Sequence, residues 1–122
     1  MSEDELLTGL ADALTLGGWR WNHTRRSDRA LVMGHPGWPD LVAVHPHRPH
    51  LLAIECKTEH GIVSADQQTW LRLLADQPGV LAFVVRPEQY DATVEWIVGD
   101  RLLPRKTPPR GTHPHPSQEG AT

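Results

Sequence analysis

Apolar residues recur every three or four positions along the first sixteen residues of the chain. This spacing places them on one face of a helix, as in helices that pack against a core. Ser2 and Glu5 form a Ser-x-x-Glu capping box at the start, and Gly17-Gly18 provides a helix end. The pattern predicts an amphipathic helix whose apolar residues are Leu6, Leu7, Leu10, Ala11 and Leu14.

Four segments have the apolar or alternating pattern of β-strands. Residues 19–23 alternate as a half-buried strand does, and residues 40–44 form a short apolar strand after a Gly/Pro-rich turn. Residues 51–57 are apolar at first and charged at their end, whereas residues 80–85 are apolar throughout, which is typical of a central strand buried on both faces. Prolines and histidines at 45–50 predict a connecting loop, because proline cannot donate to a strand ladder.

Two more helices are predicted further along the chain. Ser64 suits the N-cap of a helix that runs to Gln77, where Pro78-Gly79 breaks it. Pro87 starts the last helix, with a strand over residues 93–98 as the alternative. The apolar stripe of the first of these helices consists of Trp70, Leu71 and Leu74, with Gln67 at its edge. The order of elements predicts an α/β fold in which helices flank a small mixed sheet.

Length and composition narrow the class of protein. With 122 residues, 39% of them apolar, the chain fits one domain. Residues 104–122 are mostly proline, glycine, histidine and small residues, so we expect a domain over 1–103 and a disordered tail over 104–122. No apolar run approaches the roughly 18–20 residues that span a bilayer, the N-terminus is acidic, and Cys56 is the single cysteine. These features predict a cytoplasmic protein without membrane contact.

The net charge of −3 excludes a strongly basic nucleic-acid coat protein, but the charge is unevenly distributed. Residues 19–30 carry four arginines against one aspartate, a local charge of +3. The arginines are interleaved with Trp19, Trp21 and His23, a mixture that suits contact with a phosphate backbone. An ordinary solvated loop is the alternative. The candidate nucleic-acid-binding residues are Arg20, Arg25, Arg26 and Arg29.

The candidate chemistry is an aspartate at the start of one predicted strand and a Glu-x-Lys at the end of the next. Residues i and i+2 of a strand share a face, so Glu55 and Lys57 point to one side and Cys56 to the other. If the two strands are neighbours, Asp40, Glu55 and Lys57 converge at one end of the sheet. Two carboxylates there suit Mg²⁺ or Mn²⁺, which can polarise a phosphoryl oxygen and activate water to hydrolyse a phosphodiester. The alternatives are a turn aspartate after Pro39 and an exposed ion pair on an edge strand.

These residues belong to four blocks that resemble a known family. Pro-Asp followed by Glu-Cys-Lys is similar to the signature of the restriction-endonuclease-like, or PD-(D/E)XK, nucleases. The full blocks, residues 37–41, 54–57, 63–70 and 84–86, resemble the VRR-NUC (virus-type replication-repair nuclease) domain in order and spacing. The likeness covers about residues 3–98 and implies a restriction-endonuclease-like αβββαβ core.

The resemblance also implies roles for individual residues. It makes Asp40 and Glu55 the metal ligands, with the backbone carbonyl of Cys56 as a further ligand. It makes Lys57 the catalytic lysine, and it brings Gln67 from the first turn of its helix to the active centre. A solvated position on the helix is the alternative for Gln67.

Family members also use an acidic residue on their first helix, and the resemblance assigns this role to Glu5. Glu3 and Asp12 are poorer matches, and the capping box alone accounts for Glu5. One departure from the family pattern is Trp38, which is bulkier than the usual residue between the turn glycine and the proline. A zinc site is not favoured for the histidines at 45–50, because prolines separate them and no cysteine lies nearby.

The resemblance therefore implies a Mg²⁺-dependent endonuclease, with Mn²⁺ as a substitute, that acts on DNA and selects branched or flapped structures in phage-type replication, repair or recombination. Because so small a domain offers little surface, we expect a homodimer that places two sites on two strands. A replication, repair or packaging protein as a further partner stays unidentified. The alternative is a catalytically inactive nucleic-acid-binding module with the same fold.

Overall fold

Three α-helices and a four-stranded sheet form the part of the chain that the computed structural model describes, residues 1–24 and 33–99. Arg25, Arg26, Arg29 and the tail expected over 104–122 lie outside these residues. The elements in chain order are α1 (Glu3–Leu16), β1 (Arg20–His23), β2 (Leu41–His45), β3 (Arg48–Cys56), α2 (Ala65–Ala75), β4 (Val80–Val85), a 3₁₀ turn η1 (Pro87–Gln89) and α3 (Tyr90–Val98).

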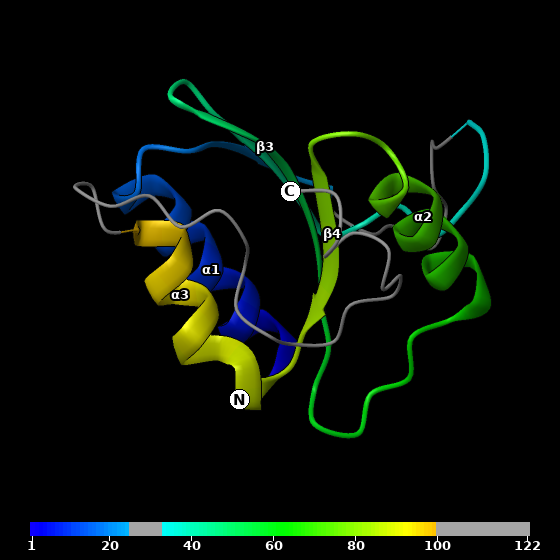
Figure 1. The fold of residues 1–122 in the computed structure, drawn as a ribbon. Coiled ribbons are helices and arrows are strands. Elements are labelled where there is room, and N and C mark those ends of the chain that lie inside the picture. The colour runs from blue at the N-terminus through cyan, green and yellow to red at the C-terminus, as the bar shows by residue number, and fades with distance from the viewer. Residues whose placement is uncertain (25–32, 100–122) are drawn as a thin grey trace.

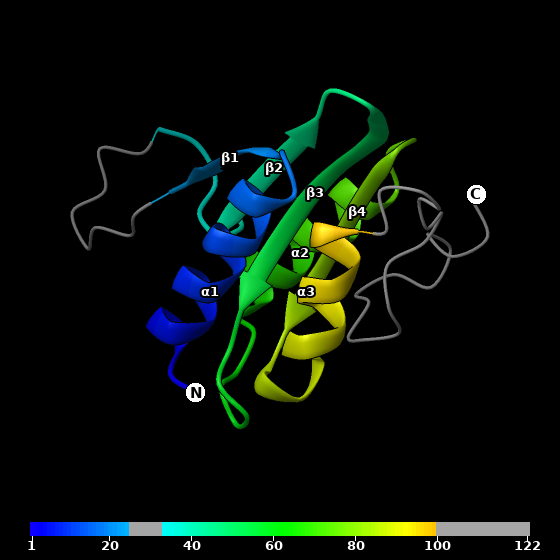
Figure 2. The same cartoon turned by 90° about the vertical axis from the view of Figure 1, so that its left-hand side faces the viewer.

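The strands lie side by side in the order β1-β2-β3-β4, and helices cover both faces of the sheet. β1, β2 and β3 are antiparallel neighbours, whereas β4 is parallel to β3 because the chain crosses over through α2. α1 and α3 pack together on one face and α2 covers the other, as Figures 1 and 2 show. This arrangement confirms the predicted α/β fold with its αβββαβ core.

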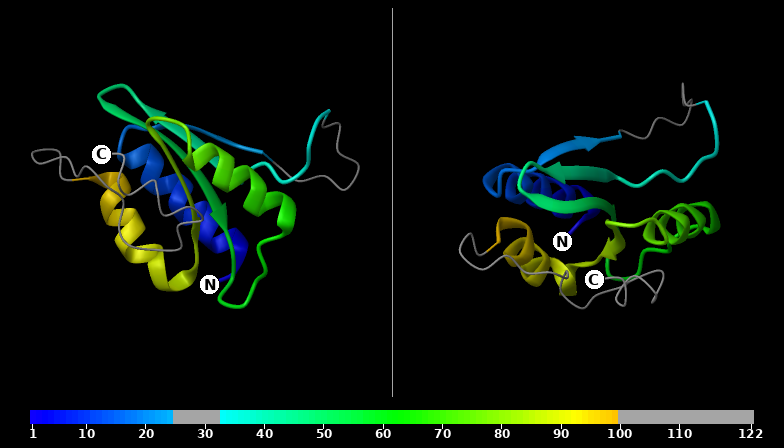
Figure 3. Two further views of the ribbon diagram at one scale, coloured as in Figure 1. Left: turned by 45° about the vertical axis from the view of Figure 1, so that its right-hand side comes forward. Right: turned by 45° about the horizontal axis from the view of Figure 1, so that its top comes forward.

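Two apolar clusters hold these layers together. The cluster beneath α1 and α3 contains Leu10, Ile54 and Trp96, and the cluster beneath α2 contains Ala53 and Leu71. Residues 53 and 54 belong to different clusters because successive side chains of a strand point to opposite faces. Glu55 therefore points toward α2, while Cys56 is buried on the side of α1 and α3. Figure 3 shows the sheet and the helices on its two faces from two further directions.

The capping box predicted at Ser2 and the N-cap predicted at Ser64 are both present, and Ser64 also forms a capping box, with Gln67. Ser2 and Glu5 exchange hydrogen bonds at the N-terminus of α1, and Ser64 and Gln67 do so at that of α2. Each box satisfies two backbone N–H groups that the first turn of a helix leaves without partners. Within residues 1–24 and 33–99, no helix is long and apolar enough to cross a bilayer.

The prediction of a loop over residues 45–50 is wrong. β2 continues through His45 and β3 starts at Arg48, so the two strands form a tight hairpin. Val44 is opposite Leu51 but His45 is opposite Arg48, so the register shifts and two residues of β3 fall within the irregularity. One of them is Pro49, which lacks an N–H group and is tolerated at an irregular position of the ladder.

Two smaller predictions also change, and one alternative is excluded. β4 is buried on both faces as expected, because helices cover both faces of the sheet. Among the described strands, however, it pairs with β3 alone, so it is an edge strand and not a central one. Residues 93–98 are helical, so the strand alternative is wrong. On α2 the buried residues are Gln67, Leu71 and Ala75, whereas Trp70 is only partly buried.

Candidate active site

Asp40 directly precedes β2 and lies beside the end of β3. Leu41 is opposite Ile54 in the antiparallel register, so Asp40 occupies the position opposite Glu55. The Cys56 backbone N–H donates a hydrogen bond to Asp40 Oδ2 across 2.8 Å. This bond fixes the carboxylate at the end of β3, and the partly exposed side chain remains within reach of solvent.

Glu55 is fully buried beneath α2, where two side chains approach it. Gln67 Nε2 donates to Glu55 Oε2 across 3.0 Å, and the Lys57 ammonium lies 4.0 Å from the same oxygen. A buried carboxylate needs such partners, because desolvation of an isolated charge costs several kcal/mol, on the order of the stability of a whole domain. The predicted trio therefore meets at one end of the sheet, with Gln67 as a fourth member.

The capping box of α2 orients Gln67 toward Glu55. Gln67 Oε1 accepts a hydrogen bond from the Ser64 N–H at 2.9 Å, which leaves Nε2 to donate to the carboxylate. Gln67 is only 2% exposed. The alternative of a solvated helix position is therefore wrong.

An open hollow of about 560 Å³ lies between the start of α1 and the ends of β1, β2 and β3. From the first two turns of α1 it is lined by Glu3, Asp4, Leu7 and Thr8, and from the strands by His23, Asp40 and Cys56. Figure 2 shows the first turn of α1 close to the end of β3. Glu5 is not part of this lining; its side chain is engaged with Ser2 in the capping box, which lowers the pKa of Glu5.

The acidic residues of α1 that line the hollow are Glu3 and Asp4 rather than Glu5. Residues i and i+4 share a helix face, so Glu3 with Leu7 and Asp4 with Thr8 form one side of α1. The Ser-x-x-Glu signature indicates that Glu5 is engaged with Ser2, and this signal could have directed attention to its acidic neighbours. His23 also lines the hollow, where its Nδ1 lies 2.8 Å from the Asp40 carbonyl oxygen.

Three carboxylates give this end of the sheet a negative potential. Burial raises the pKa of the Cys56 thiol, and the charges of Asp40, Glu55 and Glu3 raise it further. Such a field favours a cation. Among residues 1–24 and 33–99, no three His, Cys, Asp or Glu side chains are grouped as a complete metal cage. The donor set of Asp40 and Glu55 fits a hard divalent cation such as Mg²⁺, which takes one or two carboxylates and completes its shell with water.

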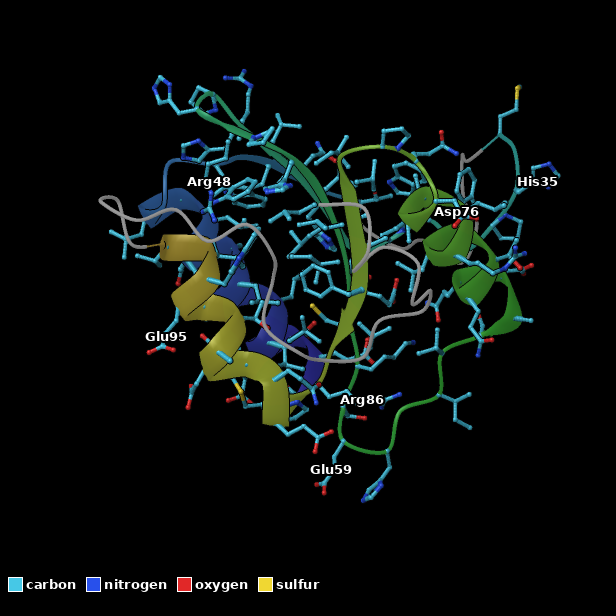
Figure 4. The ribbon with its side chains drawn as sticks, in the orientation of Figure 1. His35, Arg48, Glu59, Asp76, Arg86 and Glu95 are labelled. Carbon is cyan, nitrogen blue, oxygen red and sulfur yellow. The ribbon has the colours of Figure 1, made fainter. Side chains whose placement is uncertain are left out.

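The loop that follows Lys57 is held by Arg86, at the end of β4. Arg86 Nη1 donates to the carbonyl oxygens of Thr58 and Gly61, each across 2.8 Å. Figure 4 shows Arg86 and Glu59 together at the end of the sheet opposite Arg48. The loop between Lys57 and α2 is thereby fixed at the same end of the sheet as the site.

Of the four predicted nucleic-acid-binding arginines, Arg20 lies within the described residues, and it is not at this site. Arg20 is exposed and opposite Val44, at the end of β1 away from Asp40. Arg25, Arg26 and Arg29 lie outside the described residues. Among the described residues of the segment 19–30, His23 lines the hollow, and the Thr24 backbone N–H donates to the Asp40 carbonyl oxygen across 3.2 Å.

Comparison with known proteins gives one family and one related structure. A family model described as the VRR-NUC domain matches residues 22–89, more than half of the chain. This range includes Asp40, Glu55, Lys57 and Gln67 but not the first helix. No curated protein matches the chain significantly.

A similar solved structure is Hjc, a Holliday junction resolvase from Archaeoglobus fulgidus, with 26% sequence identity and a TM-score of 0.43. The match covers 69% of this chain and 64% of Hjc, so this chain spans less than two thirds of that protein.

Proposed function

This chain belongs to the VRR-NUC domain family of restriction-endonuclease-like nucleases, and on that premise we propose that it cleaves DNA phosphodiester bonds with the help of a divalent cation. The family makes it a nuclease domain. The choice of DNA, the cation and the residues of the site are the proposal.

One observation carries the proposal. Asp40 and Glu55 occupy opposite positions on two neighbouring strands, and the Lys57 ammonium lies 4.0 Å from the Glu55 carboxylate. Buried charged groups such as Glu55 and Lys57 are rare in a core that serves packing alone, and a cluster of charged groups at the end of a sheet is typical of a catalytic centre. The inactive binding module is less well supported, because such a module has no need of the complete set.

Each residue of the proposed site has a distinct role. Asp40 and Glu55, with the backbone carbonyl of Cys56, would hold the cation, and Glu3 replaces Glu5 as our candidate acidic residue from α1. When bound, a Mg²⁺ or Mn²⁺ ion would polarise the scissile phosphate and lower the pKa of water for the attack. Lys57 places a positive charge where negative charge develops on the phosphate, and Gln67 holds Glu55 in orientation.

The proposal extends to the substrate class and to the assembly. A single small site reaches one strand, so a branched DNA is cut on two strands most simply by a homodimer. We therefore propose a homodimer acting on branched or flapped DNA, with the basic segment at 19–30 in contact with phosphates. Light scattering at several protein concentrations measures the assembly independently of cleavage.

The decisive experiment incubates the protein with labelled four-way junctions, flaps, nicked duplexes and plain duplexes, with Mg²⁺, Mn²⁺ or EDTA. Wild type should cleave in either metal and not in EDTA. Asp40→Asn and Lys57→Ala should reduce cleavage by about 100-fold or more, in line with the loss of one group that stabilises the transition state. Glu95→Gln is the control, since Glu95 is exposed on α3 away from the site.

Cleavage that survives in an Asp40→Asn and Lys57→Ala double variant would refute the site. Tight DNA binding by wild type without cleavage under any metal would instead favour the inactive module.

A further inference from the structure

An aromatic pair lies beside the proposed active site and has no role in the mechanism above. Trp38, in the turn before β2, packs against Trp70 of α2 with ring centroids 4.9 Å apart and planes at 86°. Trp38 is 39% exposed, a high value for so large an apolar side chain. Trp70 thus covers part of the indole, while a substantial part of it stays open to solvent.

The turn that carries Trp38 is firmly attached to α2. Gly37 has a φ of +100°, and a Cβ at this position would lie 2.6 Å from the backbone carbon of Asp66, so the turn lies directly on the first turn of α2. Trp70 Nε1 donates to the His35 carbonyl oxygen across 3.3 Å. Figure 4 shows His35 beside α2, and Figures 1 and 3 show the segment before β2 passing along this helix. The Trp38 ring is therefore held in place before any ligand arrives.

Each tryptophan of the pair lies close in sequence to a residue of the proposed site. Trp38 is two residues before Asp40, which limits their Cα separation to about 7 Å. Trp70 is three residues after Gln67, so the two side chains are neighbours on the surface of α2. Gln67 in turn donates to Glu55. The indole pair is thus linked to Asp40 along the chain and to Glu55 through Gln67.

We propose that Trp38, braced by Trp70, is a stacking platform for an unpaired DNA base next to the scissile phosphate, and that it makes the domain prefer branched or flapped DNA to continuous duplex. This inference rests on the proposed function and names the structural feature of the DNA that the site selects. Bases within a duplex are already stacked and must be extruded at a cost, whereas an unpaired base at a branch is available to the indole. A held ring loses little side-chain freedom on stacking.

The first test measures stacking without cleavage. The Lys57→Ala protein is titrated, in EDTA, with a flap DNA that carries 2-aminopurine at the first unpaired position, whose fluorescence is quenched by stacking. Quenching should be strong with Trp38, retained in Trp38→Phe and lost in Trp38→Leu, with affinity for the flap about tenfold weaker in the leucine variant, as for removal of one stacked base. Leu73→Ala, which removes another exposed apolar side chain of α2, should change neither.

The second test measures selectivity in the cleaving protein. The ratio of kcat/KM for flap over duplex should fall about tenfold in Trp38→Leu, because kcat/KM falls for the flap and stays unchanged for the duplex. The ratio should recover in Trp38→Phe. Thermal melts of all variants establish that each is folded. Unchanged quenching and an unchanged ratio in a folded Trp38→Leu protein would overturn the inference while leaving the nuclease intact.

Failure of the proposed function has a different signature, namely no cleavage of any DNA by wild type. The quenching arm still decides on the stacking platform in that case. Equal affinity of wild type and Trp38→Leu for flap DNA, together with binding of an apolar peptide that only wild type retains, would identify the pair as a protein-docking patch and overturn the inference.

Discussion

Gln67→Ala tests most directly whether the Gln67 amide stabilises the buried Glu55 carboxylate. It removes the Nε2 donor to Glu55 and the Oε1 acceptor for the Ser64 N–H, while the Ser64 hydroxyl still accepts from the backbone of residue 67. A hydrogen bond to a charged group contributes about 1.5–3 kcal/mol and a neutral one about 0.5–1.5 kcal/mol. We therefore expect Gln67→Ala to lower the free energy of unfolding by about 2–4 kcal/mol, less than the roughly 5–15 kcal/mol of a typical domain.

Gln68→Ala provides the matched control. Gln68 is the same residue type in the same turn of α2, but it is exposed and donates only to the Val63 carbonyl across 3.2 Å. Its replacement should change the free energy of unfolding by no more than about 0.5 kcal/mol. Gln67→Met, which preserves most of the buried volume, distinguishes loss of the hydrogen bonds from loss of packing.

The assay is equilibrium unfolding in urea followed by tryptophan fluorescence, with cleavage of a flap substrate measured in parallel. Cleavage by Gln67→Ala should fall roughly tenfold or more, because a carboxylate that moves by about 1 Å loses much of its effect. Equal stability of Gln67→Ala and Gln68→Ala would refute the view that the amide stabilises the buried Glu55. Equal cleavage by the two variants would remove Gln67 from the site.

Three further predictions concern the turn before β2 and the opposite end of the sheet. Gly37→Ala should lower the free energy of unfolding by at least about 1–3 kcal/mol, because residue 37 has a positive φ and an added Cβ would clash with Asp66. A calorimetric melt equal to that of wild type would contradict this. Arg48→Met should lower the free energy of unfolding in urea by about 1–3 kcal/mol, and Arg48→Lys should lower it less. The reason is that the guanidinium lies 4.5 Å from the Trp96 ring centroid and donates to the Trp96 carbonyl oxygen. Burial, and secondarily the charge of Arg48, lowers the pKa of His50. Because the unfolded chain then binds a proton that the folded chain does not, the free energy of unfolding should fall as the pH drops below about 6.5. The free energy of unfolding of His50→Gln should depend less on pH.

Much of the local structure could be predicted because its causes are local. The Ser-x-x-Glu and Ser-x-x-Gln boxes specify two helix starts through contacts three residues apart, and both are present. Period-two alternation placed Glu55 and Cys56 on opposite faces of a strand, as the structure has them. The four-block resemblance to the VRR-NUC domain also needed only order and spacing, and the family match confirms it.

The failures have a common origin in contacts between distant segments. Proline content argued for a loop at 45–50, but the irregular pairing of β2 with β3 accommodates Pro49 inside a strand. A continuous apolar run suggested that β4 is central, although helices on both faces produce the same burial at the edge of the described sheet. Neither outcome is encoded within one segment.

The sequence by itself determined the elements, their order and the residue types of the site, since propensity, capping and alternation act over a few residues. Only the tertiary structure decided that Asp40 stands opposite Glu55, because strand register depends on packing across the whole sheet. It also decided that Glu3 rather than Glu5 lines the hollow, since the rotation of α1 about its axis is set by the apolar face that it buries. The partnership of Trp38 with Trp70, thirty-two positions apart, likewise depends on how the turn is seated against α2.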